Sequence, residues 1–99
     1  MSKSQILRKS VIAPTVHLNG TSQDELLKQL ADAVNAIRSA ETALAEATPH
    51  GRDYYIQPGQ AWDAAILDHN RRQHALDDVR EELELIWQNV YGQNPNRKS

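Results

Sequence analysis

The chain of 99 residues contains no cysteine and no phenylalanine, and aromatic residues make up only 5% of it. The absence of cysteine excludes a disulfide scaffold, a thiolate zinc site and a cysteine nucleophile. Basic residues do not outnumber acidic ones, and the net charge of −2 argues against binding of polymeric nucleic acid. No apolar run approaches the length of a membrane span, and the first residues lack the apolar core of a signal peptide. We therefore expect a cytoplasmic protein with no membrane contact.

The apolar residues that are present are mainly Leu, Ile, Val and Ala, and they recur with helical spacing. A chain this short buries only roughly 60–65% of its unfolded surface when it folds alone. A core built from these side chains is thin for an isolated monomer, so the composition already favours self-association.

The first long helix is predicted over residues 22–48. Ser22 and Glu25 have the spacing of a capping box, and Pro49 ends the helical pattern. The apolar residues recur at alternating spacings of four and three, which is typical of a seam that packs against another helix. This seam comprises Leu26, Leu30, Ala33, Ile37, Ala40, Leu44 and Ala47.

The second long helix is predicted over residues 60–91 and ends at Gly92. The linking residues 49–60 contain two prolines and two glycines, and we predict a loop that lets the two helices pack antiparallel. The seam of this helix contains two charged or titratable residues at positions where the period calls for apolar ones. It comprises Trp62, Ala65, His69, Arg72, Leu76, Val79, Leu83, Ile86 and Val90.

The expected fold class is all-α, with a short helix over residues 1–13 preceding the two long antiparallel helices. A single helical domain is predicted over residues 1–92, followed by a disordered tail over residues 93–99. Two helices do not cover each other's apolar sides completely. We therefore expect the N-terminal segment and a second subunit to cover the remainder in a homo-oligomer.

The seam positions His69 and Arg72, with Arg71 beside them, form the first candidate site. A buried arginine is costly unless it meets an anion. One explanation is a salt bridge to an acidic residue of the other helix, such as Asp32 or Glu41. The other is an arginine that binds a ligand phosphate.

The loop that begins PHGRDYY at Pro49 forms the second candidate site. Tyrosine can stack on a nucleobase, and arginine can bind phosphate through two N–H groups. The alternative is that the loop only anchors itself against the helices. The ligand-binding candidates here are His50, Gly51, Arg52, Tyr54 and Tyr55.

The entrance to the first long helix forms the third candidate site, because free backbone N–H groups and hydroxyls at a helix start can bind an anion. Ordinary helix capping is the alternative explanation for the same residues. The candidates are His17, Asn19, Gly20 and Thr21, with Lys28 one turn into the helix.

Enzymatic chemistry fits the sequence poorly. His69 and His74 are five residues apart, which places them on different helix faces and does not suit a zinc pair. Glu81 and Glu84 lack a facing acidic pair for a magnesium site. We therefore expect no enzyme, no metal and no cofactor.

Residues 14–22 (PTVHLNGTS), Leu26 and Leu27, and residues 49–54 (PHGRDY) resemble the phage anti-CBASS cyclic-oligonucleotide sponges. The resemblance implies an all-α protein that assembles into a hexamer. It also implies sequestration, without cleavage, of the cyclic dinucleotides and cyclic trinucleotides made by bacterial CBASS immunity, in separate pockets between subunits.

The same resemblance implies roles for individual residues. Arg72 or Arg71 from three subunits would meet the phosphates of a cyclic trinucleotide, and Lys28 would help to hold a cyclic dinucleotide. His17 stands where the family is expected to have an aromatic such as tyrosine. A sponge for cyclic ADP-ribose signals and a helical scaffold without a small ligand are the alternative functions.

Overall fold

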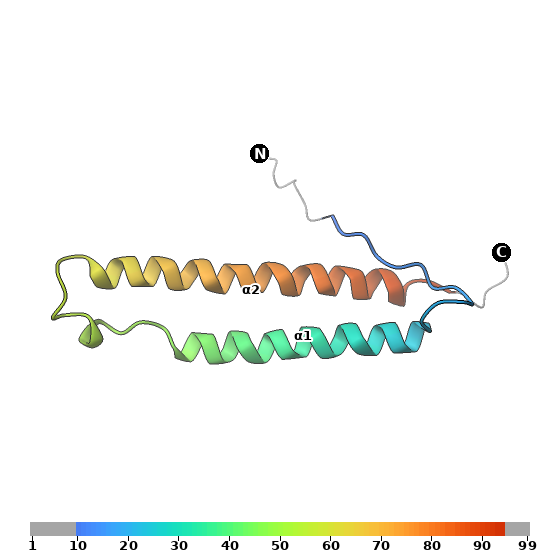
Figure 1. The fold of residues 1–99 in the computed structure, drawn as a ribbon, viewed down its shortest axis with the longest axis horizontal. Helices are drawn as coiled ribbons and strands as arrows, with labels where there is room; N and C mark the ends of the chain where they lie inside the picture. Colours follow the sequence, from blue (N-terminus) through green and yellow to red (C-terminus); the bar gives the residue numbers. More distant parts are fainter. Residues whose placement is uncertain (1–9, 95–99) are drawn as a thin grey trace. The chain divides into compact units, whose positions relative to one another are not determined.

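The computed structural model describes residues 10–94 of the chain (Figure 1). In this range the elements are all helical: α1 (Gln23–Glu46), the short 3-10 helix η2 (Gly51–Asp53) and α2 (Ala61–Tyr91). The prediction of an all-α fold is confirmed, and both long helices begin and end close to the predicted positions. No helix in residues 10–94 combines the length and apolar character needed to cross a membrane.

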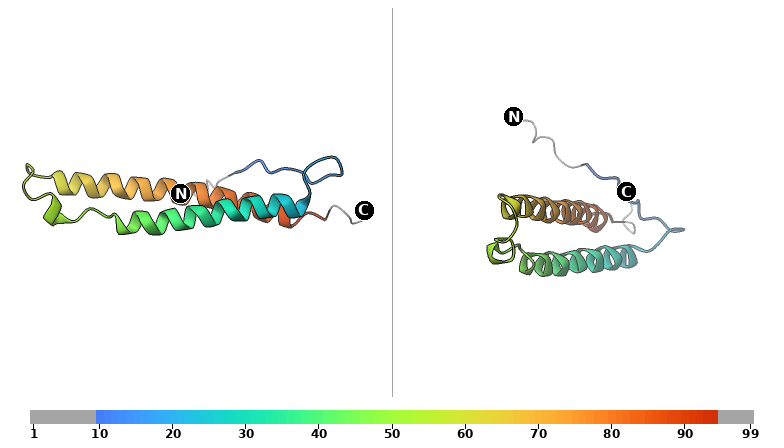
Figure 2. Two further views of the ribbon diagram at one scale, coloured as in Figure 1. Left: turned by 60° about the horizontal axis from the view of Figure 1, so that its bottom comes forward. Right: turned by 60° about the vertical axis from the view of Figure 1, so that its left-hand side comes forward.

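The described residues fall into two compact units, and each unit contains part of both long helices. The terminal unit comprises residues 10–34 and 81–94, and the middle unit comprises residues 35–80. Within each unit, the segments of α1 and α2 run antiparallel and side by side (Figures 1 and 2). The antiparallel arrangement was predicted, whereas the single domain over residues 1–92 stays a prediction.

The start of α1 follows from its capping residues. The backbone N–H of Glu25 donates to the Ser22 Oγ at 3.1 Å, which confirms Ser22 as the capping residue. Asp24 and Glu25 lie in the first turn, where their negative charges suit the positive end of the helix dipole. At the other end, the Thr48 hydroxyl donates to the carbonyl oxygen of Ala45 at 2.6 Å. The Ala45 carbonyl also accepts the Thr48 backbone N–H at 3.2 Å, so both donors of Thr48 bond to the last turn of α1.

The buried stripe of α1 differs in part from the predicted seam. Leu30, Ile37 and Leu44 are partly buried as predicted, but Ala40 and Ala47 are exposed. Beside Ala33, the larger Val34 is buried, because the free energy of burial grows with the apolar area removed from water. Beside Ala40, Glu41 is partly buried in an ion pair with Arg80. The partly or fully buried residues spaced by four and three are Gln23, Leu27, Leu30, Val34, Ile37, Glu41 and Leu44.

The buried stripe of α2 also corrects the predicted seam. Arg72 and Val79 are exposed, and the next residues along the chain, Gln73 and Arg80, take their places. The stripe follows the alternation of three and four, and it also includes Ile66 and Trp87 next to the predicted Ala65 and Ile86, which are themselves partly buried. Its partly or fully buried members are Ile66, His69, Gln73, Leu76, Arg80, Leu83, Trp87 and Val90.

The segment before α1 is held by a glutamine from beyond the end of α2, within the terminal unit. The Gln93 Oε1 accepts the Val16 N–H at 2.8 Å, and the Gln93 Nε2 donates to the Pro14 carbonyl at 2.9 Å. The side-chain amide thus bonds to two backbone groups as a neighbouring strand would. Placing Gln93 in a disordered tail was therefore wrong. The rest of that predicted tail, from residue 95, lies outside the described residues.

The short N-terminal helix is not seen where the structure can test it. Residues 10–13 have no helical backbone, and Pro14 follows them directly. Residues 1–9 of the predicted helix lie outside the described residues.

Candidate functional site

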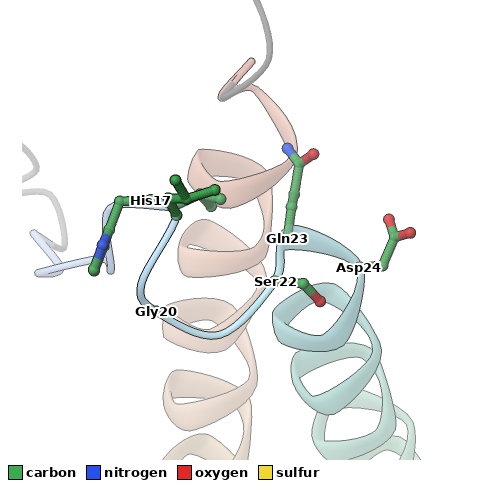
Figure 3. A pocket seen from close by; sticks show the side chains of 7 residues that line it. His17, Gly20, Ser22, Gln23 and Asp24 are labelled. Atoms are coloured by element: carbon green, nitrogen blue, oxygen red, sulfur yellow. The ribbon is translucent and has the colours of Figure 1, made fainter.

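A hollow of roughly 720 Å³ lies beside the start of α1, in the terminal unit (Figure 3). Its wall includes a turn in which the Gly20 N–H donates to the His17 carbonyl at 3.1 Å. The segment that forms the wall is the one that the sequence singled out as a candidate anion site. The lining residues are Val16, His17, Leu18, Gly20, Ser22, Gln23 and Asp24.

The His17 ring packs against the turn at Gly20, where no side chain stands in its way. A β-carbon at Gly20 would lie 2.8 Å from the His17 Nε2, closer than such atoms approach. The restriction at this position is one of space and not of backbone conformation, since Gly20 has no positive φ. The glycine therefore lets the imidazole lie over the turn at the edge of the hollow.

The electrostatics of the hollow are mixed. The start of α1 attracts anions through the helix dipole. However, Asp24 contributes a carboxylate to the wall, and the Ser22 hydroxyl is engaged with the N–H of Glu25. The capping explanation therefore accounts for Ser22. Asn19 and Thr21 are exposed in the same segment and leave polar groups for a ligand.

Lys28 is exposed and paired within α1. Its Nζ lies 2.8 Å from the Asp32 Oδ2, one helical turn further on. The hydrogen bond that Lys28 donates to Asp32, followed by the attraction of the Asp32 charge, raises the pKa of Lys28 above its ordinary value. To bind an anionic ligand, Lys28 must exchange this carboxylate for a ligand phosphate.

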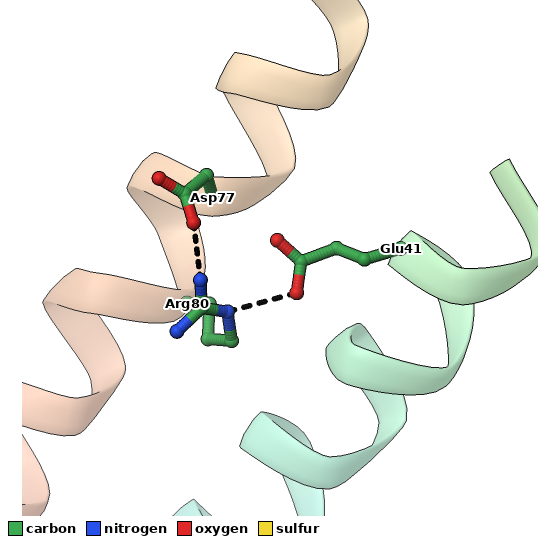
Figure 4. Close-up of polar contacts among 3 residues, drawn as sticks. All are labelled: Glu41, Asp77 and Arg80. Carbon is green, nitrogen blue, oxygen red and sulfur yellow. Dashed lines mark hydrogen bonds and ion pairs between the residues drawn. The ribbon is translucent and has the colours of Figure 1, made fainter. Parts of the chain in front are cut away.

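In the middle unit, a partly buried ion pair between the two helices exists, but it uses a different arginine from the predicted one. The Arg80 Nε lies 2.8 Å from the Glu41 Oε1, and the Arg80 Nη2 also contacts Asp77 (Figure 4). The side chains of Arg80 and Glu41 are only 17% and 25% exposed. Glu41 was predicted as a salt-bridge partner, whereas Arg80 was not predicted as the arginine of the pair. A seam that continues from His69 with spacings of four, three and four, through Gln73 and Leu76, includes Arg80.

Arg71 and Arg72, the predicted phosphate ligands, are both exposed on α2. Arg71 has a carboxylate nearby, with its Nη2 3.9 Å from the Asp68 Oδ1. The position of Arg72 in the helix–helix seam was therefore wrong, because the shift in the buried stripe turns it to the surface. Its role in ligand binding stays a prediction.

His69 occupies the seam position that the sequence assigned to it. The side chain is buried, and its Nε2 lies 3.1 Å from the Thr48 Oγ1. The residue thus joins the end of α1 to α2 inside the middle unit. With only 4% of its surface exposed, the ring of His69 presents almost nothing to a ligand.

The PHGRDYY loop is anchored by local hydrogen bonds. The His50 Nδ1 accepts the Arg52 N–H at 3.1 Å and so caps η2. The Trp62 Nε1–H donates to the Pro49 carbonyl at 3.2 Å. A β-carbon at Gly51 would lie 3.6 Å from the Trp62 ring, so this glycine sits directly against the indole.

The anchoring leaves part of the loop open to solvent. Arg52 and Tyr55 are exposed, whereas Tyr54 is half-buried. The loop-anchoring explanation therefore accounts for His50, which caps η2, and for Gly51, which lies against the Trp62 indole. Arg52 and Tyr55 are the members of this loop that remain open to a ligand.

The predicted ligand residues divide between the two compact units. His17, Asn19, Gly20, Thr21 and Lys28 belong to the terminal unit, and all the others belong to the middle unit. Among residues 10–94, no group of three histidine or acidic side chains is placed to hold a metal ion. No protein-family model, curated protein or solved structure matches this chain.

Proposed function

We propose that this chain binds cyclic dinucleotides or cyclic trinucleotides as a homo-oligomer, most simply a hexamer, and sequesters them without cleavage. In this proposal the protein acts in the cytoplasm of a phage-infected bacterium and withholds the signals of CBASS immunity. The observation that carries the proposal is the hollow beside α1. It is walled by residues 16–24, which overlap the PTVHLNGTS segment on which the resemblance to the sponge family rests.

The hollow, which His17 lines, and the chain next to it offer groups that suit a nucleotide ring. The His17 imidazole can cover the face of a base, as aromatic side chains do in single-stranded nucleic-acid sites. Asn19 and Thr21 supply polar groups at the surface of the same segment. Lys28 supplies a positive charge when the ligand displaces Asp32.

An exposed stripe on the α2 segment of the middle unit supports self-association. Leu67 is 70% exposed, and Arg71, Ala75 and Val79 follow it at intervals of four residues along one side of the helix. A subunit interface over this stripe would cover Leu67, Ala75 and Val79. It would also bring Arg71, and Arg72 beside it, close to a neighbouring chain, where a phosphate would neutralise them.

One observation favours a helical scaffold as the second candidate function. The charge inside the seam, Arg80, is already neutralised by Glu41 and Asp77 in the same unit. The packing of the helices therefore requires no external anion. A scaffold would leave cyclic nucleotides free in solution.

Native mass spectrometry with a mixed panel of cyclic di- and trinucleotides and cyclic ADP-ribose species tests the proposal. We expect an oligomer that retains intact ligand and releases it unchanged after heat denaturation. At ligand concentrations roughly a hundredfold above Kd, each site should stabilise the fold by about 2.7 kcal/mol.

The other outcomes separate the alternatives. A cleaved product identifies an enzyme, and retention of cyclic ADP-ribose species alone identifies the alternative sponge. A chain of about 11.2 kDa that retains no member of the panel supports the scaffold and rejects the proposal.

A further inference from the structure

The asparagines of this chain differ in the residue that follows each of them. There are six, and Asn19 alone precedes a glycine. The side-chain carbonyl of an asparagine can be attacked by the backbone nitrogen of the next residue. Glycine permits this attack best, because it has no side chain to obstruct the approach. Asparagine is accordingly one of the thermolabile residues of proteins.

The backbone around Asn19 also differs from that around the other described asparagines. Asn19 and Gly20 are exposed in a turn that precedes α1. Asn35, Asn70 and Asn89 lie inside α1 and α2, where helical geometry holds the following amide in the hydrogen-bond ladder. Asn94 precedes a proline, whose nitrogen carries no hydrogen.

We propose that Asn19 is a site of spontaneous deamidation. The Gly20 nitrogen, after losing its proton to solvent, attacks the Asn19 Cγ and expels ammonia, which leaves a five-membered succinimide. Water then adds to one of the two ring carbonyls and breaks its bond to nitrogen. The product is an aspartate or, when the other carbonyl reacts, an isoaspartate. In both cases an amide NH₂ has been replaced by OH.

One hydrogen bond opposes this reaction. The Gly20 N–H donates to the His17 carbonyl at 3.1 Å, so the turn must open before the nitrogen can attack. All four residues of the turn, from His17 to Gly20, are exposed, and water can replace the broken bond. A helical asparagine must instead disrupt a longer, cooperative ladder.

The product places a new negative charge between Leu18 and Gly20, two residues that line the hollow. It changes the formal net charge of the chain from −2 to −3. This consequence for ligand binding rests on the proposed function. The modified chain should bind a cyclic nucleotide more weakly, because its phosphates meet an additional carboxylate.

Peptide mass spectrometry of the full chain, aged at 37 °C and neutral pH, tests the modification without any ligand. Trypsin releases residues 10–28 as a peptide in which Asn19 is the only asparagine. We expect this peptide to gain about 1 Da at least roughly tenfold faster than the peptides that contain Asn35 or Asn70. That ratio corresponds to about 1.4 kcal/mol in activation free energy. Fragmentation assigns the change to Asn19 rather than to Gln23.

Gly20→Ala is the matched control, because the backbone of Gly20 suits alanine and only the exposed His17 ring must shift. It should slow the mass gain at Asn19 and leave the helical asparagines unchanged. Equal rates at Asn19, Asn35 and Asn70 would overturn the proposal, as would a Gly20→Ala chain that ages at the original rate. Separately, Asn19→Asp should weaken binding of a retained cyclic nucleotide. If the aged chain is deamidated but no nucleotide binds, only the proposed function fails.

Discussion

The side chain of Gln23, in the first turn of α1, donates a hydrogen bond to the backbone carbonyl of Gln93, beyond the end of α2, at 2.7 Å. The same Nε2 reaches the carbonyl of the fully buried Val90 at 2.9 Å. One amide therefore bonds to two backbone carbonyls at and just beyond the end of α2, of which the Val90 carbonyl also accepts the Gln93 N–H at 3.1 Å. Because the Gln93 side chain also binds Val16 and Pro14, these two glutamines connect three segments of the terminal unit.

Gln93→Ala should lower the free energy of unfolding by about 1–3 kcal/mol, because the substitution leaves backbone groups of Pro14 and Val16 without their partner. Chemical denaturation measures the loss, and hydrogen exchange at the Val16 amide should become faster. Gln88→Ala, at an exposed position on α2, is the control and should change stability by less than about 0.5 kcal/mol. Equal effects of the two substitutions would contradict the role of Gln93.

Arg80→Ala should destabilise the fold by about 1–3 kcal/mol, because Glu41 loses its partner in a partly buried position. Arg72→Ala should change the stability of the free protein by less than about 0.5 kcal/mol, since Arg72 is exposed. If Arg72 binds phosphate, its loss should appear instead as weaker binding of a cyclic trinucleotide. A large drop in the melting temperature of Arg72→Ala with unchanged ligand affinity would reverse this assignment.

Thr48→Val should cost about 1–3 kcal/mol, because the buried His69 loses its hydrogen-bond partner while the shape of the side chain at residue 48 is nearly kept. Thermal unfolding of the variant measures the cost. Thr42→Val is the matched control, at an exposed position on α1. A similar loss in both variants would indicate a general effect of replacing threonine by valine and not a specific bond to His69.

Asp32→Asn should lower the pKa of Lys28, because the hydrogen bond and the charge of Asp32 raise it in the native protein. A raised pKa in the folded state means that this pair contributes stability below the ordinary lysine pKa of 10.5. That contribution is lost as the pH rises through the higher pKa of the folded protein. An NMR titration of the Lys28 side chain reads the pKa directly. Asp63→Asn, in the middle unit, should leave it unchanged.

The helix ends could be predicted because single residues mark them. Ser22 caps α1, Pro49 follows its end, and Gly92 follows α2. These signals depend on local backbone chemistry and need no knowledge of tertiary contacts. The segment that walls the hollow was likewise identified from its turn residues.

The sequence does not determine which residues of α2 face α1. Arg72 and Arg80 both lie close to the period of the α2 seam, and the period does not distinguish between them. The choice depends on the opposing helix, which places Glu41 within reach of Arg80. The role of Gln93 was missed for a related reason, since its bond to Val16 joins residues 77 positions apart. No local pattern carries such a pairing.

The hydrogen bonds around Thr48 determine where His69 carries its proton. A hydroxyl has one hydrogen, and Thr48 directs it to the Ala45 carbonyl at 2.6 Å. Its oxygen can therefore only accept from the His69 Nε2, so the neutral imidazole is the Nε2–H tautomer. The nitrogen chemical shifts of His69 should show a protonated Nε2 and a bare Nδ1. The end of α1 is thus joined to α2 by two consecutive hydrogen bonds, in which the His69 ring donates to the Thr48 hydroxyl and this hydroxyl donates to the Ala45 carbonyl.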